Sequence, residues 1–155
     1  MSKSTKRVIA AAEAAGLTLD IKTMPDATRT AAQAAAAVGC DVSQIAKSMI
    51  FAGEDTGNLT LVITGGHHDI DLSRSIAFFG EPLIRADAKR VRAETGFAIG
   101  GVAPIGHLTA PTTWIDTSLF THTEVWAAAG TPHTVFAIAP ELLQRISGAK
   151  AVVLG

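Results

Sequence analysis

Apolar and polar residues recur along the chain with two different spacings, one typical of helices and the other of strands. Apolar positions three and four residues apart mark five helical segments: Thr5–Ala15, Thr30–Val38, Ser73–Phe79, Asp87–Glu94 and Pro140–Ser147. Glycines close the first four of these segments: Gly16, Gly39, Gly80 and Gly96. Pro140 suits the first turn of the fifth, because a residue there needs no partner for its backbone N–H.

Short apolar runs and period-two alternation predict the strands. These segments are Leu17–Met24, Ser48–Ala52, Leu59–Thr64, Thr113–Ile115, Glu124–Trp126 and His133–Ile138. The turn sequence Gly-Glu-Asp-Thr-Gly-Asn at 53–58 predicts an antiparallel hairpin. Ser43 is expected to cap a short helical turn that ends at Ala46. Hairpins mixed with helices, without regular strand–helix–strand spacing, predict an α+β fold with a mixed or largely antiparallel sheet.

Composition predicts one globular domain over residues 1–155, since 48% of the residues are hydrophobic and 17% are charged. No apolar run approaches the roughly 18 residues of a membrane span, so no membrane partner is expected. The basic start Met1–Arg7 leads into a segment that contains Glu13, which does not fit a signal peptide. Cys40 is the single cysteine, which excludes an internal disulfide and favours a cytoplasmic location.

The net charge of −1 does not favour a general nucleic-acid-binding protein, and no DNA partner is expected. A local basic patch is the remaining route to RNA. Arg85, Lys89, Arg90 and Arg92 form one, and positions 85, 89 and 92 would share a helical face. The alternative interpretation of these residues is a solvated helix surface.

The segment Gly100-Gly101-Val102-Ala103-Pro104-Ile105-Gly106 holds three glycines and a proline in an apolar half of the chain. Glycine allows close approach to backbone N–H groups, so such a loop can hold a carbonyl or a phosphate with main-chain dipoles. A tight connection between two strands is the simpler alternative. The spacing matches neither a Walker loop nor a dinucleotide-binding fingerprint.

Two other polar groups suggest binding. Lys47 is a lone cation in an apolar strand, and is either an edge residue that extends its ammonium to water or a functional cation aimed at an anion or carbonyl. Thr28, Arg29 and Thr30 precede a helix N-terminus, where they either cap the helix or help to hold an anion.

Other catalytic chemistry finds little support in the sequence. His67-His68-Asp69-Ile70-Asp71 raises the possibility of a metal, but adjacent side chains on an extended segment point to opposite faces. The other histidines are scattered, so no metal or other cofactor is expected. Cys40 follows a helix end and is interpreted as a small buried residue rather than a nucleophilic thiolate. No G-x-S-x-G elbow is present, and no serine has an evident partner base.

Taken in order, several segments resemble the YbaK/EbsC family of aminoacyl-tRNA deacylases, which includes the editing domain of bacterial prolyl-tRNA synthetases. The resemblance runs from about Thr28 to Leu142. Its motifs are Thr30-Ala31-Ala32-Gln33-Ala34-Ala35, Gln44-Ile45-Ala46-Lys47-Ser48, the loop Gly100–Gly106, Trp114-Ile115-Asp116 and Ala128-Ala129-Gly130-Thr131-Pro132-His133. Each motif is weak alone, whereas the ordered set is fairly specific.

The resemblance implies a partly barrel-like sheet with surrounding helices, and hydrolysis of the ester between a wrong amino acid and the terminal adenosine of a tRNA. It gives catalytic roles to Lys47 and to the Gly100–Gly101 backbone. The substrate-binding residues expected with them are Thr28, Thr30, Ser48, Val102, Pro104, Gly106, Asp116 and His133. Contact with the tRNA backbone is expected from Arg85, Lys89 and Arg92.

The resemblance also implies a small acyl group, such as Ala, Cys or Ser on tRNA for proline. A separate hydrolytic site for such groups is expected, because one binding site discriminates poorly among small apolar residues. Ser48 departs from the pattern of some alanine-specific members, so the amino acid stays open. The misacylated tRNA acceptor end is the expected partner, and a synthetase is a further one. Two alternatives remain: a non-catalytic tRNA-binding or synthetase-associated module, and a metal-dependent small-molecule hydrolase that uses His67 and Asp69.

Overall fold

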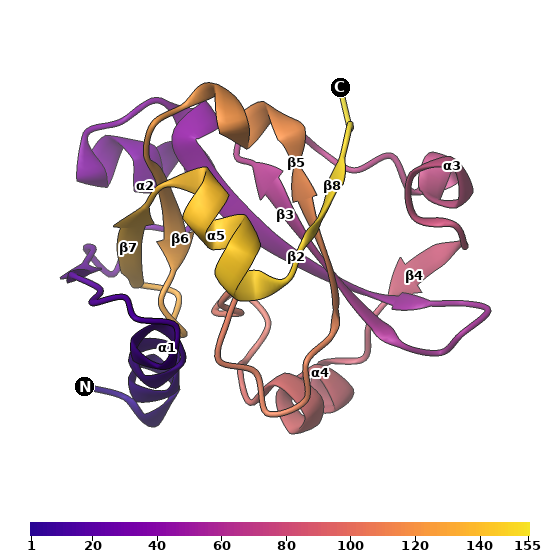
Figure 1. Cartoon of the computed structure of the whole chain (residues 1–155), viewed down its shortest axis with the longest axis horizontal. Helices are drawn as coiled ribbons and strands as arrows, with labels where there is room; N and C mark the ends of the chain where they lie inside the picture. Colours follow the sequence, from indigo (N-terminus) through magenta and orange to yellow (C-terminus); the bar gives the residue numbers. More distant parts are fainter.

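The computed structural model describes all residues 1–155 and is built around one mixed sheet of eight strands (Figure 1). The strands are β1 (Ile21–Thr23), β2 (Ile45–Gly53), β3 (Leu59–Gly65), β4 (Leu83–Arg85), β5 (Thr112–Asp116), β6 (Val125–Ala128), β7 (Thr134–Ile138) and β8 (Lys150–Val152). Their order is β1-β7-β6-β2-β3-β5-β8, and β4 pairs separately with β2. Pairing is parallel for β2–β6, β3–β5 and β5–β8 and antiparallel for the others.

The helices lie around this sheet (Figure 1). The α-helices are α1 (Lys3–Ala14), α2 (Ala31–Val38), α3 (Ser75–Phe79), α4 (Ala88–Thr95) and α5 (Pro140–Ser147), and the short 3₁₀ helices are η1 (Val42–Gln44), η2 (Leu72–Arg74) and η3 (Thr117–Thr121). None of them combines the length and the apolar character that a bilayer span requires. The single-domain α+β fold with a mixed sheet confirms the fold class predicted from the sequence.

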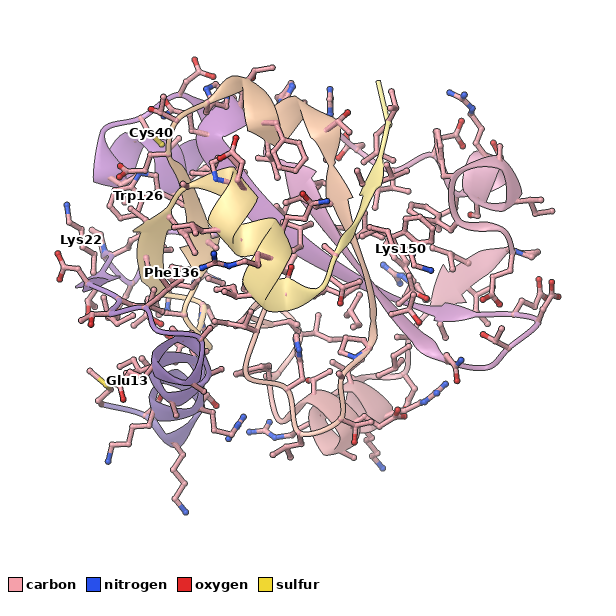
Figure 2. The ribbon with its side chains drawn as sticks, viewed as in Figure 1. Glu13, Lys22, Cys40, Trp126, Phe136 and Lys150 are labelled. Atoms are coloured by element: carbon pink, nitrogen blue, oxygen red, sulfur yellow. The ribbon has the colours of Figure 1, made fainter.

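The two faces of β2 pack into different clusters, as alternation along a strand requires. Ala46 belongs to the main core of 19 buried residues, which also holds Leu61, Ile115 and Phe136. Ile45, on the opposite face, packs with Trp126 in a second cluster, and Phe51 packs in a third. Figure 2 shows Trp126 and Phe136 on the neighbouring strands β6 and β7. β2 therefore contributes to all three clusters, with the main core on one of its faces and the two smaller clusters on the other.

Short elements account for most differences from the sequence prediction. The strand expected over Leu17–Met24 is limited to β1 at Ile21–Thr23, and β4 and β8 were not predicted. The turn expected through Ala46 ends at Gln44, where β2 begins one residue later. A strand of three residues is too short to show the period-two alternation. Its pairing partners in the sheet, rather than its own sequence, hold it in place.

The predicted helical face of Arg85, Lys89 and Arg92 is wrong in one respect. Arg85 lies on β4, opposite Phe51 of β2, and does not belong to the helix. The Asp87 side chain accepts a hydrogen bond from the Arg90 N–H at 3.0 Å, which caps α4 and fixes its start at Ala88. Lys89 and Arg92 are exposed residues of α4.

Helix α1 packs against two loops that approach the sheet. At Gly106 a Cβ would meet the Arg7 backbone at 3.1 Å, and at Gly130 a Cβ would lie 2.9 Å from the Ser4 backbone. Both glycines also have a positive φ, of 83° and 97°. A side chain at either position would therefore be strained and would push α1 away.

Polar contacts reinforce the packing of α1 near Gly106. The Arg7 guanidinium donates to the Gly96 carbonyl at 2.5 Å and stacks over the Phe97 ring. His107 Nε2 lies 2.7 Å from the Ala103 carbonyl oxygen. Burial lowers the pKa of His107 and outweighs the opposing effect of this hydrogen bond, so the ring is neutral at pH 7. α1 thus contacts the chain before the glycine-rich segment, at Gly96 and Phe97, and the end of that segment, at Gly106.

We expect Gly106→Ala to lower the free energy of unfolding by about 2–3 kcal/mol, because backbone strain adds to the contact with α1. Gly16→Ala is the matched control: Gly16 has a φ of 82° but nothing lies within 4 Å of the added Cβ. Strain alone predicts a loss of about 1 kcal/mol there. Urea unfolding of both variants measures the difference, and equal losses would contradict the role of α1.

Candidate functional site

A cavity of about 670 Å³ opens where β2 has no strand on one side. Along this edge, β6 pairs with Ile45 and Ala46, and β4 pairs with Phe51 to Gly53. The stretch between them, residues 47–50, pairs only with β3 on the other edge. The gap between β6 and β4 is therefore the floor of the pocket.

The charges around the pocket are all positive. Arg29, Lys47 and Arg85 line it, and no Asp or Glu is among its 25 lining residues. Fifteen of these residues are hydrophobic, including Ile45, Ile50 and Val102. A cavity that is mainly apolar and carries only positive charge favours a ligand with both an apolar part and an anionic part.

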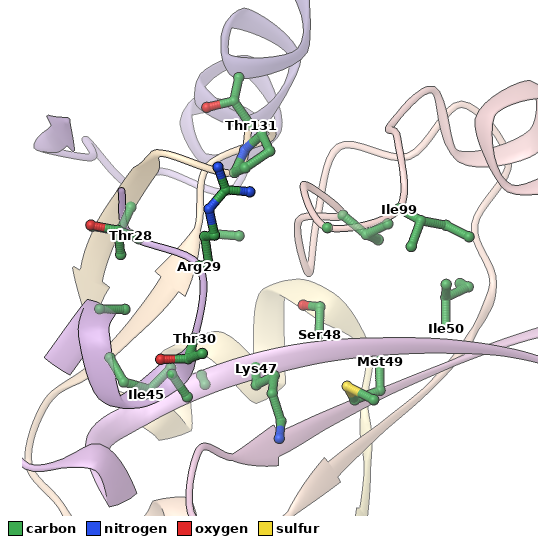
Figure 3. Close-up of a pocket in the computed structure, with 18 of the residues that line it drawn as sticks. Thr28, Arg29, Thr30, Ile45, Lys47, Ser48, Met49, Ile50, Ile99 and Thr131 are labelled. Carbon is green, nitrogen blue, oxygen red and sulfur yellow. The ribbon is translucent and has the colours of Figure 1, made fainter. Parts of the chain in front are cut away.

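Lys47 and Ser48 leave β2 on opposite sides (Figure 3). The Lys47 ammonium donates to the His68 carbonyl at 3.2 Å and lies 3.8 Å from Asp69 Oδ1. Its side chain is 28% exposed, and Asp69 is fully exposed. Lys47 is thus held against the loop after β3 but remains open to solvent and to a ligand at the rim.

Ser48 faces the main-core side of β2, next to Ile50 (Figure 3). Its Oγ is buried and has no hydrogen-bond partner within the chain. A buried hydroxyl without a partner costs about 1–3 kcal/mol, which a ligand or a water in the pocket can recover. The sequence prediction placed Ser48 among the binding residues, and the structure places it in the pocket wall.

The polar segment before α2 forms another wall. Thr28 and Thr30 line the pocket together with Arg29. Thr30 also caps α2, since its hydroxyl accepts from the Gln33 N–H while Gln33 Oε1 accepts from the Thr30 N–H. Thr30 is therefore a helix cap that also lines the cavity, so its capping role leaves the predicted ligand contact open.

The glycine-rich loop reaches the pocket through Gly100 and Val102. The Gly101 N–H donates to the Ala98 carbonyl at 2.9 Å, so it is not free to hold a ligand carbonyl. A Cβ at Gly101 would lie 3.1 Å from the Thr131 backbone, which explains the glycine by close packing of two loops. The Gly100 N–H, in contrast, makes no hydrogen bond within the chain.

Four of the predicted substrate-binding residues are not in the pocket wall: Pro104, Gly106, Asp116 and His133. Pro104 is buried in the loop, and Gly106 packs on α1. His133 lies in the β6–β7 turn, and its Nδ1 is buried without a partner.

Asp116 lies at the end of β5 and is 1% exposed. Its carboxylate accepts from the Gly65 N–H at 3.0 Å, from His68 Nδ1 at 2.7 Å and from the Ser118 N–H at 2.9 Å. Burial alone would raise the pKa of Asp116, but these hydrogen bonds outweigh burial and hold the pKa below its usual value. Asp116 thereby fixes His68, whose carbonyl holds Lys47.

The basic patch is only partly at the pocket. Arg85 lines the wall, and Lys89 and Arg92 are exposed on the adjoining α4. Arg90 has a structural partner on each side: its Nε lies 2.5 Å from Glu94, and its guanidinium also bonds to the Gly57 carbonyl. The free cations near the rim are thus Arg85 and Lys89, with Arg92 one turn further along.

Sequence reasoning missed several apolar residues of the wall. Ile50 and Ile99 face each other across the pocket (Figure 3), and Ile99 is 54% exposed. Thr131 and Pro132 form the facing rim. Two sequence signals were available for these positions. Ile99 is a large apolar residue directly before the glycine-rich loop, and Thr131 and Pro132 form a Thr-Pro pair in a turn.

Two other kinds of polar arrangement bear on catalysis, a metal-binding cluster and a serine next to a histidine. No group of three or more His, Cys, Asp or Glu is placed to hold a metal ion. Ser43 contacts His122 Nε2 at 2.9 Å but donates its own proton to Asp41 at 2.7 Å. His122 therefore donates to Ser43 and does not act on it as a base.

Asp116→Asn should lower the free energy of unfolding at neutral pH. It should also remove the part of that free energy that depends on the ionisation of Asp116. Because the pKa of Asp116 is lower in the folded state, its stabilisation is complete above the usual value of 3.8 and is lost as the pH falls below it. The difference in the free energy of unfolding between wild type and variant should therefore shrink below pH 4. Urea titrations from pH 2 to 7 measure it, and a constant difference would contradict this prediction.

Comparison with known proteins agrees with this geometry. The sequence model of the aminoacyl-tRNA editing domain matches residues 25–146. YwhH of Bacillus subtilis (strain 168) is 31% identical over 131 residues, which cover 84% of this chain and 83% of YwhH.

Solved structures extend the likeness to the whole fold. One, described as a candidate trans-editing enzyme for prolyl-tRNA synthetase, is 42% identical with a TM-score of 0.91 over 99% of this chain and 98% of its own. Another, the hypothetical protein APE2540, is 28% identical with a TM-score of 0.81 over 94% and 98%. The chain therefore belongs to the aminoacyl-tRNA editing domain family, in agreement with its resemblance to the YbaK/EbsC deacylases.

Proposed function

We propose that this protein is a trans-editing deacylase, which hydrolyses the ester between a small amino acid and the terminal ribose of a misacylated tRNA. The observation that carries the proposal is the meeting of Lys47, Ser48, Thr28, Thr30 and the Gly100 loop around one cationic, largely apolar cavity. The family supports the editing reaction, and the similarity to the prolyl-tRNA synthetase trans-editing candidate favours tRNA for proline as the substrate.

The chemistry suits a site without a nucleophilic side chain. An aminoacyl ester of a ribose hydroxyl is already reactive, so orientation of water and stabilisation of the oxyanion suffice. Water adds to the carbonyl carbon, the bond to the ribose oxygen breaks, and that oxygen takes up a proton. The amino acid leaves as a carboxylate. The neighbouring free hydroxyl of the ribose is the group proposed to orient the water.

Each wall of the pocket has a proposed role. Lys47 supplies positive charge at the carbonyl or the terminal phosphate, and the Gly100 N–H, which makes no hydrogen bond within the chain, is a main-chain donor for the oxyanion. Ser48 and Val102 border the acyl group, and Thr28 and Thr30 border the ribose. Asp116 acts as a positioning residue, because it orders the His68 loop that holds Lys47.

A panel of mischarged tRNAs incubated with the pure protein tests the function. We expect multiple turnovers on small acyl groups (Ala, Ser or Cys) attached to tRNA for proline, with full activity in EDTA. Binding of tRNA without turnover would replace the proposal with a non-catalytic module. Activity lost to EDTA would replace it with a metal-dependent hydrolase.

In the same assay, Lys47→Ala should lower kcat/KM for deacylation by about 100-fold or more, because a charge-assisted contact is lost. Its melting temperature should change little, since the ammonium has one weak ion pair at the surface. Lys150→Ala is the matched control: Lys150 stacks on Trp114 and lies on β8, at the far end of the sheet (Figure 2). Wild-type rates for Lys47→Ala would contradict the assignment.

Neutralisation of Arg85 and Lys89 should weaken tRNA binding and reduce its salt dependence by about one unit of slope per lost phosphate contact. Hydrolysis of a minimal aminoacyl-adenosine should change little. Arg90→Ala serves as the comparison, since its bonds to Glu94 and Gly57 predict a loss of stability instead. Filter binding at several salt concentrations measures the slope, and an unchanged slope would place the tRNA surface elsewhere.

A further inference from the structure

The open edge of β2 presents backbone groups to the pocket. Gly66 N–H donates to the Ile45 carbonyl and Gly53 N–H to the Asn58 carbonyl, so the odd-numbered residues of β2 direct their N–H and C=O groups toward β3. The even-numbered residues direct theirs the opposite way. Ser48 and Ile50 lie in the gap between β6 and β4, so the Ser48 C=O and the Ile50 N–H face the cavity side by side.

The space beside this edge is lined by apolar side chains on both faces. Ile50 and Ile99 face each other on one side, and Met49 projects to the other side of β2 (Figure 3). All three line the cavity. A flat group bonded to the edge would therefore have apolar contacts above and below its plane, and a methionine sulfur on one of them.

We propose that this edge binds the adenine ring of the terminal nucleotide. The exocyclic N6 amino group donates to the Ser48 carbonyl, and N1 accepts from the Ile50 N–H. The pairing uses the Watson–Crick edge of the base, as proteins do when they read an unstacked nucleotide. The inference rests on the proposed function for the identity of the nucleotide and adds the site that holds its base.

The order of donor and acceptor selects among bases. Adenine carries an amino donor next to a ring acceptor, which complements a carbonyl followed by an N–H. Hypoxanthine and guanine carry a carbonyl next to a ring N–H, and this reversed order would place like groups opposite each other on the strand. Arg29 and Arg85 line the cavity from different elements, and either can donate hydrogen bonds to the phosphate, since no carboxylate lines the cavity.

Binding of free nucleotides tests the site without reference to catalysis. Adenosine 5′-monophosphate should bind at least about 10-fold more tightly than inosine 5′-monophosphate, because two hydrogen bonds are replaced by two unpaired groups. In ¹⁵N-resolved NMR spectra, the Ser48 and Ile50 amides should shift with the adenine nucleotide. Equal affinities, or shifts confined to other residues, would overturn the proposal.

Substrate analogues provide a second test of the adenine site. Aminoacyl-tRNA ending in 7-deazaadenosine, which keeps N1 and N6, should be hydrolysed like the normal substrate. With 1-deazaadenosine or inosine at the end, kcat/KM should fall about 10-fold or more, because a hydrogen-bonding group of the edge loses its partner. Equal rates on all four ends would overturn the adenine site while leaving the deacylase function intact.

An Ile50 amide-to-ester replacement removes the N–H and keeps the side chain. It should weaken adenosine 5′-monophosphate binding about 10-fold and lower the melting temperature only slightly, since this N–H faces no other strand and the Met49 carbonyl stays in place as a weaker acceptor toward β3. The same replacement at Met49, whose N–H faces β3, is the control and should lower stability. Unchanged binding in the Ile50 ester would overturn the proposal. Selective adenine binding by a protein that hydrolyses no ester would uphold the site and refute the proposed function.

Discussion

The interruption of strand pairing along one edge of β2 is the constraint on which the site depends. β6 leaves β2 after Ala46, and β4 joins it only at Phe51. A continuous partner would fill this edge and close the cavity. The β2–β3 hairpin holds the other edge over seven paired positions, so the open stretch keeps its extended shape without a second strand. The gap is therefore a rigid feature of the sheet and not a frayed end.

The surroundings of the gap are fixed from outside the sheet. α1 packs on Gly106 and Gly130, which brings the glycine-rich loop and the β6–β7 turn to the same side of the pocket. Gly101 lets these two segments touch each other through the Thr131 backbone. The glycines of this region thus act mainly in packing loop against helix and loop against loop. This geometry leaves the Gly100 N–H unbonded within the chain at the pocket wall, where it can meet a ligand.

Sequence reasoning recovered the long elements and the residues that alternate on them. The hairpin of β2 and β3 was predictable because its turn and its two apolar runs are adjacent in the chain. Lys47, Ser48, Thr28, Thr30, Gly100 and Val102 were named in advance and do line the cavity. β4 was not predictable, since its three residues are held in place by β2, and Arg85 was consequently assigned to a helix. The resemblance implied binding roles for Pro104 and Gly106, and the sequence alone could not show that Gly106 packs against α1, because that partner is distant in sequence.

The two faces of β2 contribute different groups to the site. On one face, the Lys47 ammonium meets the His68 carbonyl, and Asp116 fixes His68 from beneath with a carboxylate that stays charged. A buried carboxylate there balances histidine and backbone donors without entering the cavity, so the cavity keeps its positive potential. On the other face, Ser48 and Ile50 offer a hydroxyl and an apolar surface. Between the faces lies the free backbone edge, which provides directional hydrogen bonds at no cost in side-chain entropy. Charge, shape and hydrogen-bond direction therefore come from a single strand, and a ligand that uses all three must combine an anion, an apolar group and a flat polar edge.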